Sequence, residues 1–325
     1  MRFIRATIVT VLALCAGAGV SGVLAAQSAA TGAAGASGAT QAAQPAPLTS
    51  LLGRVLLPLP ANAAVDSAKD RLAHKPDDIE ALLAMGQAWD RVWRFRESID
   101  AYSRASSLAP QDWRALSVRG QRYISTRQLD SAVADLEKAR ELAPESFHSL
   151  YHLGLAYYFV GRYADAAAAL GHCADLAARD SSVARDTSRV PLELRPCSRL
   201  SEVHRYALAS WRAAALMRSG QENAVKASLQ SLPPRPRTSK EGQWFYDIVD
   251  NTLGRKSDSL GVYTSMTGGG ALTMGYLMAN LAITRGDSVS GCRVLRDLLS
   301  REEWPAFGYI GAESDIARGR CKGIR

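Results

Sequence analysis

The chain has 325 residues, of which 47% are hydrophobic and 22% are charged, so it can bury at least one sizeable core. Its formal net charge is +8, and the basic residues are scattered among acidic ones instead of forming a run. This mild surplus argues against a nucleic-acid partner, although it permits an acidic partner or an anionic membrane surface. Few segments alternate polar and apolar residues, which predicts almost no strands.

Residues 1–26 have the pattern of a secretory signal. Arg2 and Arg5 form a basic start, the next 21 residues carry no charge, and small residues offer a cleavage site near Ala25 or Ala26. Cleavage would lower the formal net charge to +6. The alternative is an uncleaved anchor, because 21 uncharged residues could just span a bilayer. We therefore expect an exported protein, either periplasmic or membrane-associated on the extracytoplasmic side.

The next segments are a linker and an apolar cap. Residues 27–48 are mostly Ala, Gly, Ser, Thr, Gln and Pro without charge, so they have almost nothing to bury and form a flexible linker. Residues 49–60 contain six leucine or valine side chains and are expected to cap the start of the fold. The alternative is a docking segment for a partner or a membrane surface. Residues 62–75 are expected to form one helix that ends before Pro76.

Glycines and prolines then recur every 34 residues. The markers are Gly86, Gly120 and Gly154, together with Pro76, Pro110 and Pro144. A period of this length is typical of two antiparallel helices that stack on the next pair, because one pair cannot cover its own apolar face. The small residues let the two helices of a pair approach closely, and the proline ends the second helix.

The residues between these markers resemble the tetratricopeptide repeat family. Aligned on the glycine, seven positions agree in the first two units and six in the third. They are Leu82, Gly86, Trp89, Ser98, Tyr102, Ala105 and Pro110, then Leu116, Gly120, Tyr123, Ala132, Leu136, Ala139 and Pro144, and then Leu150, Gly154, Tyr157, Ala166, Leu170 and Cys173. The resemblance covers about residues 79–178 and implies an all-α solenoid of antiparallel helix pairs. Arg119 replaces an apolar family residue, so its guanidinium must reach solvent or a carboxylate.

The 34-residue period ends with the third unit. Residues 179–198 are polar, contain two prolines and are bracketed by Cys173 and Cys197, which predicts an insertion loop held at its base. Residues 199–325 keep only the outline of helix pairs and end in a C-terminal cap. The Gly-rich stretch 267–270 is expected to be a flexible break between two of these pairs.

Four cysteines remain after removal of the signal segment, and an even number in an exported chain suggests disulfides. Four cysteines allow three pairings. Pairing of neighbours, Cys173 with Cys197 and Cys292 with Cys321, closes two loops of similar length. The alternative is four free thiols, because a buried cysteine is ordinary at the small-residue position of Cys173.

The sequence carries no recognisable catalytic motif. His148 and His152 are four residues apart on one expected helix, but the segment lacks the glutamate of an HExxH zinc motif. No phosphate-binding or dinucleotide-binding glycine pattern occurs either. We therefore expect no metal, no cofactor and no enzymatic activity.

The resemblance implies that the first helix of each unit lines a concave groove. The expected groove residues are Gln87, Arg91, Arg114, Gln121, Tyr151, Tyr158 and Phe159. Exposed aromatic and arginine side chains are the usual anchors of protein interfaces. The alternative is that residues 179–198 cover the three aromatic side chains. Leu83 and Gln87 stand where chaperone-binding relatives use Lys and Asn to bind a carboxylate, which puts that ligand in doubt.

Together, these features predict a non-enzymatic scaffold of the cell envelope that binds a partner polypeptide in the groove. The alternative is a permanent accessory subunit of a membrane-bound complex, held by an uncleaved N-terminal helix.

Overall fold

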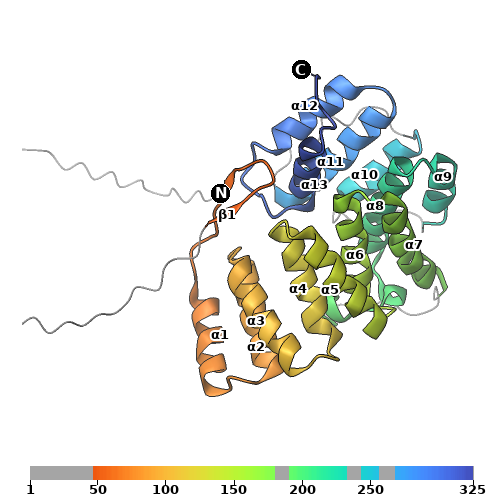
Figure 1. Cartoon of the computed structure of the whole chain (residues 1–325). Coiled ribbons are helices and arrows are strands. Elements are labelled where there is room, and N and C mark those ends of the chain that lie inside the picture. Colours follow the sequence, from red (N-terminus) through yellow and green to blue (C-terminus); the bar gives the residue numbers. More distant parts are fainter. Residues whose placement is uncertain (1–46, 180–189, 233–242, 256–267, 325) are drawn as a thin grey trace, which may run out of the picture. The chain divides into compact units, whose positions relative to one another are not determined.

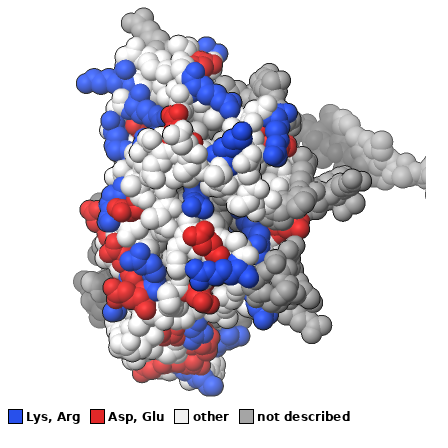
Figure 2. Space-filling model, turned by 90° about the vertical axis from the view of Figure 1, so that its right-hand side faces the viewer, with Lys and Arg blue, Asp and Glu red and all other residues white. Residues whose placement is uncertain are grey.

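The computed structural model describes residues 47–179, 190–232, 243–255 and 268–324. The predicted signal or anchor, nearly all of the linker and residues 180–189 of the insertion lie outside this part of the chain. Within the described ranges, no helix combines the length and the apolar composition needed to cross a bilayer. On the face shown in Figure 2, acidic and basic side chains are interspersed.

Helices follow the repeat pattern from residue 63 onwards. The first helix is single, and three pairs follow it. They are α1 (Ala63–His74), α2 (Ile79–Arg91) with α3 (Phe95–Leu108), α4 (Trp113–Ser125) with α5 (Leu129–Leu142), and α6 (Phe147–Val160) with α7 (Tyr163–Arg179). Each helix packs against the next one along the chain (Figure 1). The predicted fold class, an all-α solenoid of antiparallel helix pairs, is confirmed.

The repeat glycines lie where the two helices of a pair come closest. A Cβ atom added at any of these glycines would lie 2.6 Å or less from the side chain that fills the space. The glycines and the side chains opposite them are Gly86 with Tyr102, Gly120 with Leu136, and Gly154 with Leu170. The 34-residue period therefore reflects one packing contact made three times.

Helices continue beyond the third pair without the period. They are α8 (Glu202–Arg218), α9 (Glu222–Gln230), α10 (Gln243–Thr252), α11 (Gly268–Thr284), α12 (Ser288–Leu298) and α13 (Phe307–Ala317). The predicted partner of α10, residues 257–263, lies outside the described residues. The prediction of a flexible break at 267–270 was wrong for residues 268–270, which form the first turn of α11. Gly270 lies directly against the Trp244 ring, where an added Cβ atom would come within 2.9 Å.

Two cysteine pairs join neighbouring elements, with the sulfur atoms in bonding contact. Cys173 of α7 pairs with Cys197, and their Cα atoms are 5.3 Å apart. Cys292 of α12 pairs with Cys321, with Cα atoms 5.7 Å apart. This is the pairing of neighbours considered above. The first pair holds the segment that contains the short 3-10 helices η1 (Leu192–Leu194) and η2 (Cys197–Arg199) against α7.

A short hairpin near the start of the described chain packs on its last helices. Its antiparallel strands are β1 (Leu48–Thr49) and β2 (Val55–Leu56). The backbone N–H of Leu51 donates to Glu313 Oε1 at 2.8 Å. The indole N–H of Trp304 donates to the carbonyl of Leu57 at 2.9 Å. Residues 49–60 therefore contact the C-terminal part of the described chain, a role that the prediction of a cap at the start of the fold did not include.

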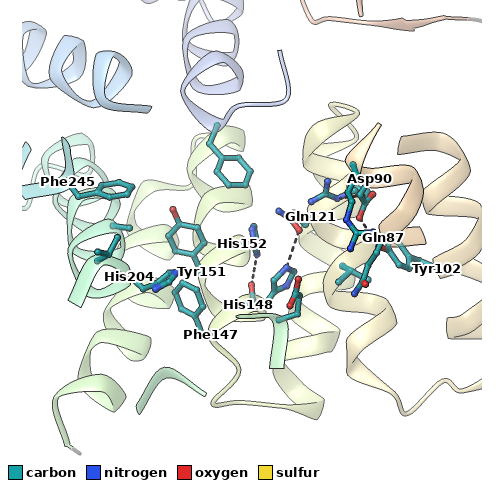
Figure 3. Close-up of a pocket in the computed structure, with 17 residues that line it drawn as sticks. Gln87, Asp90, Tyr102, Gln121, Phe147, His148, Tyr151, His152, His204 and Phe245 are labelled. Atoms are coloured by element: carbon teal, nitrogen blue, oxygen red, sulfur yellow. Dashed lines mark hydrogen bonds and ion pairs between the residues drawn. The ribbon is translucent and has the colours of Figure 1, made fainter. Parts of the chain in front are cut away.

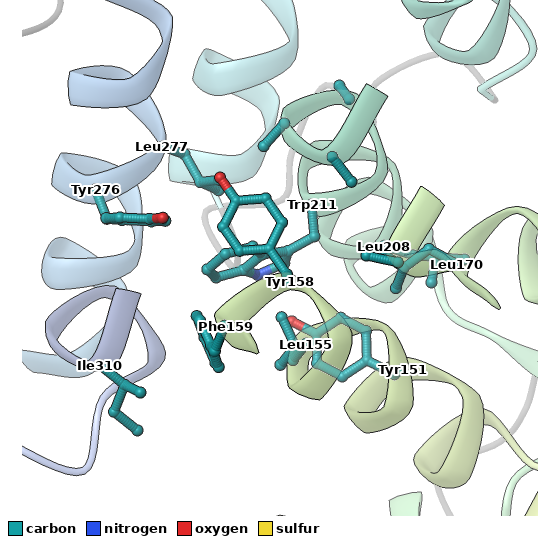
Figure 4. Close-up of a cluster of buried hydrophobic side chains, with 14 of the residues drawn as sticks. Tyr151, Leu155, Tyr158, Phe159, Leu170, Leu208, Trp211, Tyr276, Leu277 and Ile310 are labelled. Atoms are coloured by element: carbon teal, nitrogen blue, oxygen red, sulfur yellow. The ribbon is translucent and has the colours of Figure 1, made fainter. Parts of the chain in front are cut away.

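The largest core cluster joins the third repeat to later helices. Tyr158 and Phe159 of α6 pack edge-on against Trp211 of α8, with ring centroids 5.5 and 5.8 Å apart. Tyr276 of α11 lies 5.7 Å from Trp211 and 6.2 Å from Tyr158, so these three rings contact one another (Figure 4). All four side chains are fully buried. Residues far apart in sequence therefore share one core.

Candidate functional site

The helices line an open cavity of about 480 Å³. Side chains of α2 and α4 line one side, and side chains of α6, α8, α10 and α13 line the opposite side (Figure 3). Cavities of this size bind small molecules or short stretches of polypeptide. The two sides differ in chemistry, and each is described in turn.

The side formed by α2 and α4, here called the polar wall, consists of Gln87, Asp90, Gln121 and Arg122. Asp90 Oδ2 accepts a hydrogen bond from the Tyr102 hydroxyl at 2.7 Å. Asp90 Oδ1 lies 3.6 Å from Arg122 Nε, and both atoms are buried without a hydrogen-bond partner. Burial raises the pKa of Asp90, while the Arg122 guanidinium opposes the shift. The polar wall thus contains a buried ion pair between Asp90 and Arg122.

Two histidines of α6 lie between the polar wall and the Tyr151 ring (Figure 3). His148 Nε2 donates to Gln121 Oε1 at 3.1 Å, and its Nδ1 is hydrogen-bonded to the Ser117 hydroxyl at 2.7 Å. His152 Nδ1 donates to the carbonyl of His148 at 2.7 Å. Burial lowers the pKa of His148 and lowers that of His152 to about 3, so both rings are neutral at pH 7. Among the described residues, no three His, Cys, Asp or Glu side chains are grouped as metal ligands would be.

The opposite side, here called the aromatic wall, consists of Phe147, Tyr151, Phe245 and Phe307. Phe147 and Tyr151 are one turn apart on α6, with ring centroids 5.2 Å apart. Phe307, at the start of α13, lies 6.5 Å from Tyr151. Phe245 of α10 adds a fourth ring from another helix (Figure 3). Burial raises the pKa of Tyr151, so this wall is uncharged at neutral pH.

The cavity contains four of the seven predicted groove residues. These are Gln87, Arg91, Gln121 and Tyr151. They come from the first helices of all three repeats, as the resemblance implied. Their role in binding a partner stays a prediction.

Arg114 does not line the cavity. Its guanidinium forms ion pairs with Asp112 at 2.6 Å and with Glu80 at 2.7 Å. Hydrogen bonds to these carboxylates raise its pKa. Arg119, the departure from the family pattern, is likewise paired, because it donates to both carboxylate oxygens of Asp135 at 2.6 and 2.8 Å. Both arginines are therefore engaged in contacts within the repeats.

Tyr158 and Phe159 do not lie in an open groove, contrary to the prediction. Both are fully buried in the core around Trp211. Helices α8 and α11 contribute rings that pack on them. Residues 180–189, which belong to the insertion of the alternative, lie outside the described residues. The repeat period predicts which face of α6 is not packed within its own helix pair. It cannot show that later helices bury that face.

Sequence reasoning missed Phe245 and Phe307. Both belong to helices outside the 34-residue period, and neither position carries a motif. Only the packing of α10 and α13 brings these two rings to the repeats. Arg122 was also missed, although it follows Gln121 directly on α4.

A family model described as a tetratricopeptide repeat, TPR_8, matches residues 147–180. This segment is the third helix pair, α6 and α7. This match, and the same packing contact in the first two pairs, support a tetratricopeptide repeat protein. No curated protein matches the chain.

Several solved structures show a distant likeness. A tetratricopeptide repeat protein from Parabacteroides merdae has a TM-score of 0.44 and 13% identity, over 76% of this chain and 91% of that one. YrrB, described as having an unusual peptide-binding site, has a TM-score of 0.42 and 11% identity, over 73% and 93%. MamA MSR-1 has a TM-score of 0.39 and 16% identity, over 59% and 86%. At this level of likeness, nothing about a ligand follows from them.

Proposed function

We propose that the protein is a non-enzymatic interaction scaffold that binds a segment of a partner polypeptide in the cavity between the polar and aromatic walls. The proposal rests on one observation, which is that two walls of different chemistry line the same cavity of about 480 Å³. One wall offers hydrogen-bonding groups and the other offers rings, and a polypeptide presents both chemistries along its length. The repeat fold supplies helices that hold the two walls in place.

We infer further that the scaffold works in the cell envelope. The two cysteine pairs favour an oxidising compartment, since disulfides persist there. The basic and uncharged pattern of residues 1–26 agrees with export. In the alternative, the protein is a permanent subunit of a membrane-bound complex and residues 1–26 are retained as its anchor.

The test is a selection from a phage-displayed random peptide library on the purified protein. Val203→Trp adds an indole inside the cavity, because Val203 lines it from α8. Val133→Trp is the matched control, since Val133 is a half-buried residue of α5 outside the cavity lining. Circular dichroism shows whether both variants keep their helices.

Selected peptides should bind the wild type and Val133→Trp alike and lose about ten-fold or more in affinity for Val203→Trp. Peptides that bind Val203→Trp as tightly as the wild type would place the binding surface elsewhere. A selection that enriches no peptide on the wild type would overturn the proposed function.

A further inference from the structure

Exposed aliphatic side chains are concentrated in the hairpin segment near the start of the described chain. Nine large hydrophobic residues are exposed in the part of the chain that the structure describes, and five of them lie between residues 51 and 59. These five are Leu51, Leu52, Val55, Leu57 and Leu59, each between 41% and 67% exposed. Single exposed leucines are ordinary, but a group of them on one segment marks a surface that another molecule covers.

The outer face of the hairpin is apolar. Leu48 lies opposite Leu56 and Thr49 lies opposite Val55, and residues directly opposite each other share a face of the sheet. Leu56 is buried and Val55 is 47% exposed, so the first pair faces the core and the second faces solvent. The solvent face of an antiparallel sheet is ordinarily polar, whereas here the exposed Leu57 follows Val55.

Main-chain contacts hold the segment in this orientation. Near its start, the backbone N–H of Leu51 donates to Glu313 Oε1 at 2.8 Å. Near its end, the backbone N–H of Leu59 donates to the carbonyl of Val92 at 2.9 Å. The exposed leucines therefore cannot turn inwards without breaking contacts that fix both ends of the segment.

The segment is also nearly free of charge. From residue 6 to residue 65 the sequence carries one charged side chain, Arg54. Arg54 Nη1 donates to the carbonyls of Leu299 and Arg301 at 2.8 and 3.0 Å, which holds this base beside the exposed leucines. A base next to an apolar surface suits a bilayer, where anionic phosphates lie above the acyl chains.

The composition favours lipid over protein as the molecule that covers the leucines. The residues that dominate protein interfaces are mostly Trp, Tyr and Arg, and leucine and valine are under-represented among them. All five exposed side chains of the segment are leucine or valine. The uncharged residues 6–26 are joined to the hairpin by residues 27–47, a stretch that spans at most about 75 Å when fully extended. A retained anchor would therefore keep the hairpin within this distance of the bilayer.

We propose that residues 48–59 form a membrane-surface contact, in which the five exposed leucine and valine side chains enter the acyl region and Arg54 stays among the phosphates. The inference rests on the envelope location proposed above. It does not involve the cavity, whose described lining includes no residue of the hairpin. An apolar insertion of this size gives weak and reversible binding, as a single acyl chain does.

The experiment measures how the mature protein, residues 27–325, binds to vesicles of phosphatidylcholine and phosphatidylglycerol in equal parts, by flotation. Residues 1–26 are omitted so that they cannot account for the binding. The test variant combines Leu51→Ser and Leu52→Ser. The matched control combines Leu108→Ser and Leu194→Ser, because these leucines are 48% and 43% exposed in other parts of the fold. A second readout is the emission of an environment-sensitive fluorophore attached to Leu52→Cys or to Leu108→Cys.

The wild type and the matched control should bind the vesicles alike, and the test variant should bind about ten-fold or more weakly. The fluorophore at position 52 should shift to shorter wavelength when vesicles are added, and the one at position 108 should not. No vesicle binding by the wild type, equal binding by the test variant, or unchanged emission at position 52 would overturn the inference.

Light scattering tests whether a second copy of the chain covers the leucines instead. A wild-type dimer that the test variant converts to a monomer would overturn the inference in favour of self-association. Peptides selected by phage display should bind the test variant as they bind the wild type, because the cavity is unchanged. Failure of vesicle binding would therefore leave the proposed partner binding intact.

Discussion

His152 is a residue whose burial affects the pH dependence of stability. Its ring is covered by the third repeat and by Phe307, whose ring centroid lies 5.6 Å away. Burial lowers its pKa to about 3, against roughly 6.5 for an exposed histidine. Between these values the unfolded chain binds a proton that the folded chain does not bind, so stability falls as the pH falls from 6.5 towards 3.

We predict that His152→Asn, which keeps a donor near the position of Nδ1, reduces this pH dependence. When the pH is lowered from 7.5 to 5.5, the free energy of unfolding of the wild type should fall. That of the variant should fall by about 1.4 kcal/mol less. Urea unfolding at the two pH values measures the difference. His74→Asn, at an exposed position of α1, should behave as the wild type. An equal loss in His152→Asn and the wild type would show that His152 is not the titrating group.

At the scale of elements, the helix pairs depend on glycines that leave no room for a side chain. Gly120 of α4 faces Leu136 of α5, and an added Cβ atom would lie 2.6 Å from Leu136 Cγ. Alanine is the better helix former by about 1 kcal/mol. A loss of stability on substitution can therefore come only from the overlap with Leu136.

We predict that Gly120→Ala lowers the free energy of unfolding by about 1–3 kcal/mol, as overpacking does. In a Leu136→Ala background the same change should be neutral or stabilising, so a double-mutant cycle by urea unfolding should show coupling between the two sites. Gly269→Ala in α11 is the control, because its nearest neighbour would be 3.5 Å from the added atom. Equal effects of Gly120→Ala in both backgrounds would contradict the packing account.

At the scale of the described molecule, the first repeats are joined to the last helices by buried polar and aromatic contacts. Arg127, in the turn after α4, forms an ion pair with Glu313 of α13 at 2.7 Å, and both side chains are buried. Trp304 packs edge-on against Trp93 and Phe95, with ring centroids 5.8 and 5.4 Å apart. These contacts also keep Phe307, three residues after Trp304, at the cavity.

We predict that Trp304→Ala loosens this junction while the third repeat stays folded. The variant should lose about 3–5 kcal/mol of stability, as other large core truncations do. Hydrogen exchange should speed up in residues 48–57 and 307–317 and stay unchanged in α6 and α7. Trp113→Ala, at the start of α4, is the control for loss of a half-buried indole. Unchanged protection of residues 48–57 would mean that the hairpin is held by other contacts.

The sequence alone was enough to predict the repeats, because their packing is local. The Gly120 and Leu136 contact joins residues 16 positions apart, and the same contact recurs in the other two units, so it leaves a periodic pattern. The sequence also predicted that the Arg119 guanidinium reaches either solvent or a carboxylate. In the structure it donates to the carboxylate of Asp135. The neighbour pairing of the cysteines was among the options that the sequence left open.

Only the tertiary structure shows which other elements pack against the side chains of the repeats. Tyr158 and Phe159 belong to the core and Tyr151 to the cavity, although all three were expected on one groove. The difference arises because α8 and α11 pack on one end of α6, and α10 and α13 bring Phe245 and Phe307 to the other. Such contacts join residues more than 50 positions apart without a repeated spacing, so they leave no periodic signal in the sequence.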